Sequence, residues 1–421
     1  MTPSRRSSST EQAAHPWQQA DIRSLLTRAA LAVGAGSPTD AGVSWAPLEA
    51  APRPIVLAGG VPDPETLPVA DLSEAFRRVL EASPQDALRY GGVLGFEGLR
   101  SALAERQGRS EGISLQSDNF IVTNGSAGAI ATICDAFVEP DDVVIVEAPT
   151  FSGSLRTFRG HLAEVVPVPM DSRGLLPDAV ASAIESRRRV KLVYTVADYH
   201  NPTGTTLSLD RRRELVRLCA EHQVLIVEDA AYSDISFGAP PPPSLYALAG
   251  GQGVLKAGTF SKSMATGLRV GWVQGRQDFI EALARVRFDM GTSPLLQRAI
   301  ADYIGRGKLE THLREVRPLY AQKCDALCRS LAQDCGPYVR FGRADGGFFL
   351  WVECVGARAQ DVAREAAREG LVFPVGSLFY LDGEQADTAH VRLAFSTATL
   401  EELAQVGPRL RAAFERAVGE R

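Results

Sequence analysis

The feature that most constrains this chain is a regular alternation of short apolar segments with helix-like segments, which runs from about residue 118 to residue 275. Apolar segments that are hydrophobic throughout, rather than at every second residue, are typical of strands buried on both faces. The segments are 120–123, 143–146, 163–166, 191–194, 224–227, a shorter run around Leu255, and 270–273. The sequence therefore predicts an α/β fold with a large, doubly wound, mostly parallel sheet.

Two of the intervening segments have clear helical periodicity, 126–137 and 210–221. In the second, Leu215, Leu218 and Cys219 share one face, and Asp210 is expected to cap the helix. Beyond residue 277 the pattern changes to a mostly helical stretch that ends near 335. Strand-like segments then alternate with helical ones, which predicts a smaller α+β domain; the strands are 347–352 and 390–395, and the helices 359–369 and 400–418.

The length of 421 residues agrees with two or three domains at roughly 150 residues each. We expect residues 1–53 to form a partly flexible N-terminal arm with one helix from Ile22 to Val33. Residues 54–300 are predicted to form the large domain, and the first of them are candidates to join the small one. Residues 301–421 are predicted to form the small C-terminal domain.

Charge and composition exclude several classes of protein. The formal net charge is −5 and basic residues form no dense stripe, so no nucleic-acid partner is expected. The run 211–213 is interpreted as a solvated helix face and the run 187–189 as a loop. No apolar run reaches the roughly 18 residues of a membrane span, and the N-terminus lacks a signal core. A cytoplasmic protein without a membrane partner is expected.

The six cysteines form no CxxC pair and the six histidines are scattered. This pattern favours reduced, mostly buried thiols over metal ligands, so no metal site is predicted.

Polar residues follow several predicted strands, at the edge where open α/β sheets bind ligands. Gly125-Ser126-Ala127 opens a helix after one strand, where backbone N–H groups favour a phosphate, although a tight turn is the commoner reason for a glycine at such a position. Asp229 ends another strand and needs a cation or several donors if it is buried; helix capping is the alternative. In the loop that holds Asn201, the preceding His200 is interpreted as solvent-facing, with a polar pocket residue as the alternative.

Lys262 is one of only five lysines among 45 basic residues. It is flanked by the hydroxyls of Thr259, Ser261 and Ser263, and Arg269 follows within a glycine-containing segment. An amine beside hydroxyls and a guanidinium is the arrangement expected for an aldehyde cofactor that carries a phosphate.

Four motifs occur together and in a fixed order: Asn201-Pro202-Thr203-Gly204, Asp229-Ala230-Ala231-Tyr232, Ser261-Lys262 and Gly267-Leu268-Arg269-Val270-Gly271. In this set the chain resembles the class I/II family of fold type I, pyridoxal 5′-phosphate (PLP) dependent aminotransferases, over about residues 55–418. The resemblance is strongest to the aminoadipate/kynurenine aminotransferase branch and to the aminotransferase-like half of MocR-type regulators.

The resemblance implies PLP as the cofactor and a role for each motif residue. Lys262 is expected to bond to the cofactor and then to move a proton between the substrate and the cofactor. Asp229 is expected to pair with the pyridine nitrogen, and Asn201 and Tyr232 with the phenolic oxygen of the ring. The phosphate ligands implied are Gly125, Ser126, Ala127, Thr259, Ser261 and Arg269.

Further residues match family positions outside these motifs. Phe151 stands where the family usually has a ring-stacking tyrosine, so the stacking is kept and the hydroxyl is lost. Arg392 matches the arginine that binds the substrate carboxylate, and Gly60 is expected to offer it a backbone N–H, with a plain turn as the alternative. Tyr90 resembles the tyrosine that reaches the phosphate of a neighbouring subunit, which implies a homodimer with shared active sites.

The function implied is transfer of the amino group of an α-amino acid to a 2-oxo acid. The same residues also suit a PLP-dependent lyase, replacement enzyme, cyclase or oxidase, because the cofactor carries most of the chemistry. A MocR-type regulator is disfavoured, since the arm is short and insufficiently basic for the helix-turn-helix domain of such proteins.

Overall fold

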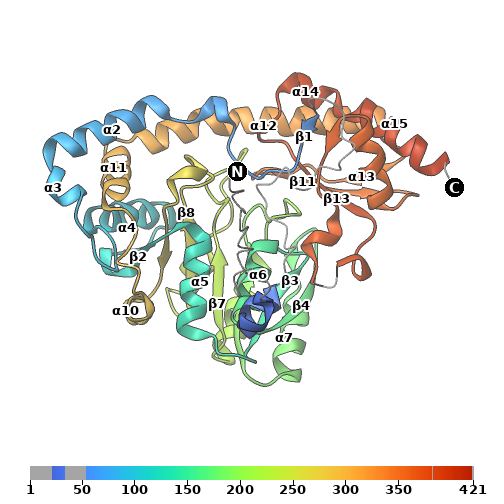
Figure 1. Ribbon diagram of the computed structural model, residues 1–421. Helices are drawn as coiled ribbons and strands as arrows, with labels where there is room; N and C mark the ends of the chain where they lie inside the picture. The colour runs from blue at the N-terminus through green and yellow to red at the C-terminus, as the bar shows by residue number, and fades with distance from the viewer. Residues whose placement is uncertain (1–20, 34–53, 382, 420–421) are drawn as a thin grey trace, which may run out of the picture.

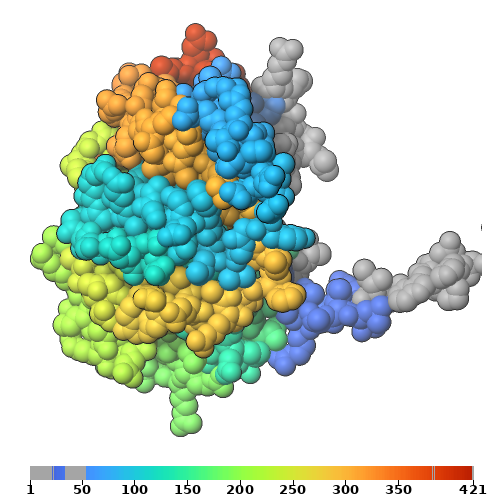
Figure 2. All heavy atoms as spheres, turned by 90° about the vertical axis from the view of Figure 1, so that its left-hand side faces the viewer, coloured from blue at the N-terminus to red at the C-terminus, as the bar shows by residue number. Residues whose placement is uncertain are grey.

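The computed structural model describes residues 21–33, 54–381 and 383–419, and predictions for the rest of the arm lie outside them. The helix predicted from Ile22 to Val33 is divided into a 3₁₀ turn, η2 (Ile22–Leu25), and helix α1 (Arg28–Val33). The division follows from the extended backbone of Leu26, with φ −72° and ψ 144°. In Figure 2 this segment, drawn in blue, projects from one side of the body.

The predicted large sheet is confirmed: among the described residues it has eight strands in the order β2-β9-β8-β7-β6-β3-β4-β5. The strands are β2 (Phe120–Thr123), β3 (Val143–Ala148), β4 (Glu164–Asp171), β5 (Gly174–Leu175), β6 (Val190–Thr195), β7 (Leu225–Asp229), β8 (Val254–Thr259) and β9 (Gly271–Gln274). β9 runs antiparallel to both of its neighbours, and β5 runs antiparallel to β4. The remaining strands share one direction, so their carboxyl ends meet at one edge of the sheet.

Helices cover both faces of this sheet, as continuous apolar strands require. Alternate residues of β3 belong to different core clusters: Val144 and Val146 to one face, Val143 and Ile145 to the other. The first face is packed with α5 (Gly125–Phe137), α6 (Ser152–Gly160) and α10 (Gln277–Val286), and the second with α7 (Pro177–Ser186), α8 (Leu209–Glu221) and α9 (Leu245–Leu248).

A 27-residue helix, α12 (Lys308–Asp334), connects the large sheet to a separate core. Its first half contributes Leu313 and Tyr320 to the core of the large sheet, and its second half contributes Leu327 and Leu331 to the other core. In Figure 1, α12 crosses the molecule above the large sheet. Near its start pack α11 (Pro294–Gly305), α2 (Val69–Ala82), α3 (Pro84–Ala87) and α4 (Glu97–Glu111).

The second core surrounds a three-stranded antiparallel sheet of order β10-β11-β13. Its elements are β10 (Val339–Phe341), β11 (Phe349–Cys354), α13 (Ala359–Arg368), β13 (His390–Ala394), α14 (Leu400–Ala404) and α15 (Val406–Gly419). The chain also places an early segment here, because β1 (Ile55–Val56) pairs in parallel with β12 (Leu371–Val372).

Two predictions about α8 were wrong. Asp210 does not cap the helix: Ser208 holds the N-cap position, and Asp210 lies in the first turn beside Arg173 at 2.5 Å. The run 211–213 is not a solvated face, because Arg212 is fully buried. Arg212 lies three and seven residues before Leu215 and Cys219, on the apolar face of the helix. Because all three residues of the run are charged, the sequence pattern did not indicate that Arg212 belongs to the apolar face.

The described residues contain no helix that is long and apolar enough to cross a membrane. They also contain no group of three or more His, Cys, Asp or Glu side chains that could hold a metal ion. All six cysteines are free thiols, and Cys328 is the only one of them that is not fully buried.

Candidate active site

The carboxyl edge of the large sheet collects most of the residues predicted for the site. Each of the parallel strands β2, β3, β6, β7 and β8 ends at one of them or a few residues before one. In chain order these are Gly125, Phe151, Asn201, Asp229 with Tyr232, and Ser261 with Lys262. Segments far apart in sequence thus meet because the strands share one direction.

Asp229 is buried at the end of β7 and accepts two hydrogen bonds. Tyr194 Oη donates to its Oδ2 at 2.8 Å, and the backbone N–H of Ala231 donates to its Oδ1 at 3.1 Å. Burial raises the pKa of Asp229, while the bond from Tyr194 opposes that rise. A carboxylate in such a place is ready to hold a protonated ring nitrogen, which would restore its ionised form.

Lys262 lies half-buried beyond the end of β8. Its Nζ donates a 2.6 Å hydrogen bond to the carbonyl oxygen of Gly60 and lies 5.5 Å from the centroid of the Tyr232 ring. The positive charge of Lys262 also lowers the pKa of Asp229. The one amine of the site therefore faces both the predicted electron-sink partner and the segment that contains Gly60.

The predicted phosphate ligands form a cradle at the start of α5. Thr259 Oγ1 donates to Ser261 Oγ at 2.9 Å, and Arg269 Nη1 donates to the same oxygen at 3.2 Å. Gly125 has φ +69°, and a Cβ at this position would lie 2.7 Å from Arg269 Nη2. Glycine therefore leaves the space that an anion needs between the helix start and the guanidinium.

This donor set fits a phosphate: hydroxyls, an exposed guanidinium and the N-terminus of a 13-residue helix converge on one place. Ser126 is half-buried and Ala127 exposed at that helix start. Ala127 has only its backbone N–H to offer.

Arg392 on β13 brings the small sheet to the same site. It is fully buried, its Nη1 donates to Asn201 Oδ1 at 2.7 Å, and its guanidinium lies 4.4 Å and 4.6 Å from the ring centroids of Phe349 and Phe379. A Cβ at Gly60 would lie 2.4 Å from Phe349 Cζ, so the backbone there approaches the aromatic ring as only glycine allows.

Three residues of this site were missed by the sequence analysis. Phe349 and Phe379 flank Arg392, and Tyr194 supports Asp229. Tyr194 carries a hydroxyl at the end of an otherwise apolar strand, directly before a predicted ligand loop. That position was a usable signal. Phe379 ends a short 3₁₀ helix, η7 (Gly376–Phe379), whose position depends on tertiary packing, and no local pattern marks it.

Two predicted residues are not drawn into this cluster by the contacts within one chain. Tyr90 is 83% exposed. Phe151 is half-buried at the N-cap of α6, where a Cβ at Gly153 would lie 2.6 Å from its ring.

The interpretation of His200 as solvent-facing was wrong, because the side chain is buried. Its Nδ1 lies 2.9 Å from Thr203 Oγ1, and its Nε2 lies 3.0 Å from Glu147 Oε2, at ion-pair distance but outside hydrogen-bond geometry. Glu147 also accepts hydrogen bonds from Thr195 Oγ1 at 2.6 Å and from the backbone N–H of Val196 at 3.0 Å. The polar sequence of the loop predicted an exposed histidine, but the loop folds back onto the carboxylate of Glu147, near the end of β3.

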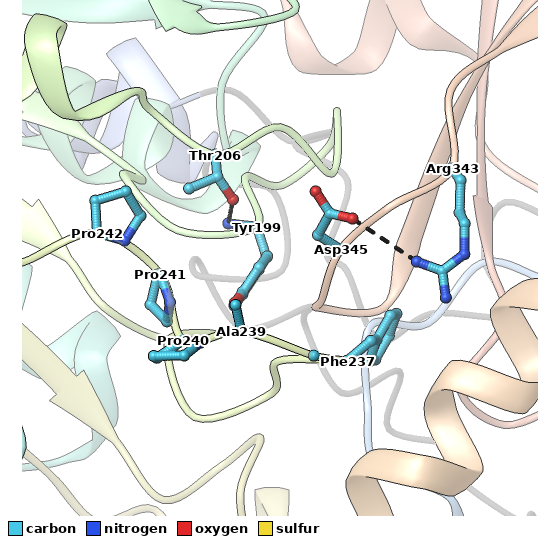
Figure 3. Close-up of a pocket in the computed structure, with 10 residues that line it drawn as sticks. Tyr199, Thr206, Phe237, Ala239, Pro240, Pro241, Pro242, Arg343 and Asp345 are labelled. Carbon is cyan, nitrogen blue, oxygen red and sulfur yellow. Dashed lines mark hydrogen bonds and ion pairs between the residues drawn. The ribbon is translucent and has the colours of Figure 1, made fainter.

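Two cavities share the proline run 240–242 among their lining residues. The smaller, of about 340 Å³, is shown in Figure 3: Pro240, Pro241 and Pro242 lie on one side, Arg343 and Asp345 on the other, and Tyr199 between them. Arg343 Nη1 lies 3.7 Å from Asp345 Oδ1. The larger cavity, of about 820 Å³, reaches the phosphate cradle only at Thr259.

Comparison with known proteins places this geometry in a family. Residues 53–406 match the model of the family described as aminotransferase class I and II. The 2-aminoadipate transaminase of Thermus thermophilus is 31% identical over 361 residues, an alignment that covers 84% of this chain and 88% of that protein. The kynurenine aminotransferase of Pyrococcus horikoshii, solved in complex with PMP, has a TM-score of 0.82 at 29% identity, covering 87% of this chain and 91% of that chain.

The predicted likeness to MocR-type regulators is confirmed as well. The probable rhizopine catabolism regulatory protein MocR of Rhizobium meliloti is 28% identical over 78% of this chain, which corresponds to 66% of the regulator. The family match covers most of the chain, and the donor set of the site suits a phosphate-bearing cofactor. This chain therefore belongs to the class I and II aminotransferases and is a PLP-dependent enzyme that transfers amino groups of amino acids.

Proposed function

We propose that Lys262 is the catalytic lysine and that the residues around it have the roles expected from the motifs. One observation carries the proposal: Lys262 donates a hydrogen bond to the Gly60 carbonyl, Arg392 donates one to Asn201, and the ring of Phe349 lies against both Gly60 and Arg392. Tyr232 lies beside Lys262 and near Gly60. An amine for proton transfer and a guanidinium for a carboxylate thus belong to one constellation.

PLP, when bound, supplies the electron sink that stabilises negative charge at the amino-acid Cα. Asp229 keeps the ring nitrogen protonated, for which its buried, hydrogen-bonded position is suited. Lys262 Nζ would take the proton from the amino-acid Cα and return it on the cofactor side, since a neutral lysine amine is both nucleophile and base.

The remaining residues hold and orient the cofactor and the substrate. Gly125, Ser126, Ala127, Thr259, Ser261 and Arg269 hold the phosphate; Phe151 stacks on the ring; Asn201 and Tyr232 hydrogen-bond its phenolic oxygen. Arg392 holds the substrate carboxylate through two parallel N–H groups, assisted by the Gly60 N–H. The aromatic rings of Phe349 and Phe379 fix the plane of that guanidinium.

We further propose that the enzyme is a homodimer in which Tyr90 reaches the phosphate cradle of the partner subunit. Tyr90 and Phe288 are 83% and 95% exposed. Their segments are neighbours, because a Cβ at Gly291 would lie 2.3 Å from the carbonyl oxygen of Gly92. Exposed apolar side chains gathered in this way favour contact with a second copy.

Two other features stay proposals: a cytoplasmic location, and the division into an arm (1–53), a large domain (54–300) and a small domain (301–421). β1 pairs with β12, which lies within residues 301–421, and this pairing supports assigning the first residues after the arm to the small domain.

The test is a screen of α-amino acids, 2-aminoadipate and kynurenine included, against pyruvate and 2-oxoglutarate. We expect consumption of the amino acid to require the oxo acid and to match it mole for mole. Release of ammonia without an oxo acid would instead assign a lyase or oxidase reaction to these residues.

A further inference from the structure

The larger cavity has a wall rich in charged side chains that the active site does not use. Its volume of about 820 Å³ lies within the range of small-molecule sites. It is lined by the end of α4, the segment from Ala230 to Ser244, side chains of β8 and β9, and one face of α12. Pro240 to Pro243 and Trp272 give it an apolar side.

The carboxylates of this wall are already paired with cations. Asp234 and Glu310 each lie 2.7 Å from nitrogens of Arg106. Glu111 pairs with Lys256 and accepts a hydrogen bond from Ser244 Oγ at 2.6 Å. Asp198 lies 2.5 Å from Arg212 Nη2 and accepts a hydrogen bond from Ser233 Oγ.

Arg317 on α12 differs from the other cations of the wall. Its Nε donates to the backbone carbonyl of Asp234 at 2.7 Å, which fixes the guanidinium against the wall. Among the residues that the structure describes, its two terminal nitrogens have no hydrogen-bond partner, and it forms no ion pair within 4.0 Å. A half-buried guanidinium held by one nitrogen presents the other two as a fork to the cavity.

We propose that this cavity binds the carboxylate group of a small metabolite on Arg317, at a site separate from Arg392. A planar carboxylate matches the two parallel donors of the fork. The other cations of the wall are paired with carboxylates, so a group of higher charge such as phosphate would bring negative charge that Arg317 alone does not neutralise. The proline run and Trp272 suit an apolar body attached to the carboxylate.

The cavity lies next to the active site without overlapping its substrate side. Ala230, which lines it, directly follows Asp229, and Thr259 belongs to the phosphate cradle. Arg392, Gly60 and Lys262 do not line it. Binding at Arg317 is therefore independent of whether the proposed roles of those three residues are right.

The experiment uses calorimetric titration of the PLP-loaded enzyme with 3-phenylpropionate, which has a carboxylate and an apolar body but no amino or oxo group to react. We expect two sites per subunit in the wild type. Arg317→Gln should weaken one of them by about 10- to 100-fold, the loss expected for charge-assisted hydrogen bonds. Arg392→Met should weaken the other and leave the Arg317 site unchanged.

The matched control is Arg314→Gln, one turn earlier on α12. Arg314 is exposed, bonds within its own helix to Glu310 O and Thr311 Oγ1, and does not line the cavity. We expect this variant to retain both sites. The proposal would be overturned if the wild type had no site that Arg317→Gln weakens and Arg392→Met leaves unchanged.

Inorganic phosphate, titrated in the same way, tests the chemical class. We expect it to show no binding that depends on Arg317, and phosphate binding lost only in Arg317→Gln would contradict the carboxylate assignment. The transamination screen is a separate measurement, so failure of the proposed reaction and failure of this site are distinguishable.

Discussion

Arg392 Nη1 donates a 2.7 Å hydrogen bond to Asn201 Oδ1, and this contact joins the small sheet to the loop after β6 of the large one. The predicted binder of the substrate carboxylate and a predicted ligand of the cofactor ring are thus held to each other. The rings of Tyr232, after β7, and Phe349, on β11, add a second contact between the small sheet and the large one, with centroids 5.4 Å apart.

This pairing predicts the behaviour of Arg392→Lys. Lysine keeps the charge but loses the planar fork that binds a carboxylate through two bonds and stays between Phe349 and Phe379. We expect kcat/KM for the amino acid to fall, mostly because KM rises. The expected fall corresponds to a loss of about 2–5 kcal/mol of transition-state stabilisation. Arg340→Lys on β10, 72% exposed, is the control and should leave the kinetics unchanged. An unaltered KM in Arg392→Lys would remove this residue from the proposed site.

The large sheet could be predicted from the sequence for a physical reason. Strands such as 143–148 are apolar on both faces, so their pattern is strong, and parallel strands bring the residues that follow them to one edge. The family motifs then supplied Lys262, Asp229 and Arg392 with their expected roles.

What the sequence did not predict depends on tertiary packing. The burial of His200 and Arg212 requires partners, Glu147 and Asp198, that lie 53 and 14 residues away. A local sequence pattern predicts that a charged or polar side chain is exposed, because the pattern does not include the distant partner that makes its burial possible. Phe379 contacts Arg392 from the end of η7, and no periodicity in the sequence marks that position.

Lys262 is the residue on which the reaction depends most. We expect Lys262→Ala to lower turnover by at least about 10²- to 10⁴-fold, the contribution of a positioned acid–base group. Absorbance of the cofactor bonded to lysine should also disappear. Lys308→Ala is the matched lysine control, since Lys308 pairs with Asp71 on the surface and is 38% exposed. Full turnover in Lys262→Ala would end the proposed mechanism.

Tyr194 is expected to set the acid limit of the reaction. Its hydrogen bond lowers the pKa of Asp229, which burial otherwise raises. In Tyr194→Phe that opposition is lost, so the pKa of Asp229 rises further and its carboxylate becomes protonated at a higher pH. The acid limb of the kcat/KM profile should therefore move to higher pH than in the wild type, with weaker binding of PLP. Tyr338→Phe, whose ring stacks on Phe414 in the small core, should not move it. A shift to lower pH in Tyr194→Phe would contradict this role.

Arg212 should matter for stability rather than for the reaction. Its buried guanidinium bonds to Asp198 Oδ1, to Leu207 O at 2.8 Å and to Ala197 O at 2.9 Å, and so ties α8 to the segment that leads to Asn201. Replacing it with methionine keeps the volume of the stem but leaves Asp198 buried with only Ser233 as a partner. An uncompensated buried charge costs about 3–5 kcal/mol, so the free energy of unfolding of Arg212→Met should fall by that amount in urea titrations.

The neighbouring residue supplies the control for that measurement. Arg213 is exposed on the same helix, and Arg213→Met should change the free energy of unfolding by no more than about 0.5 kcal/mol, as is usual for surface positions. Each variant removes one positive charge, and the two positions are adjacent in the sequence. A general effect of charge would therefore lower the free energy of unfolding of both variants equally. Only loss of the buried pair with Asp198 lowers one and not the other. Equal stability of the two variants would mean that the Arg212–Asp198 pair adds nothing to the folded state beyond what its apolar replacement supplies.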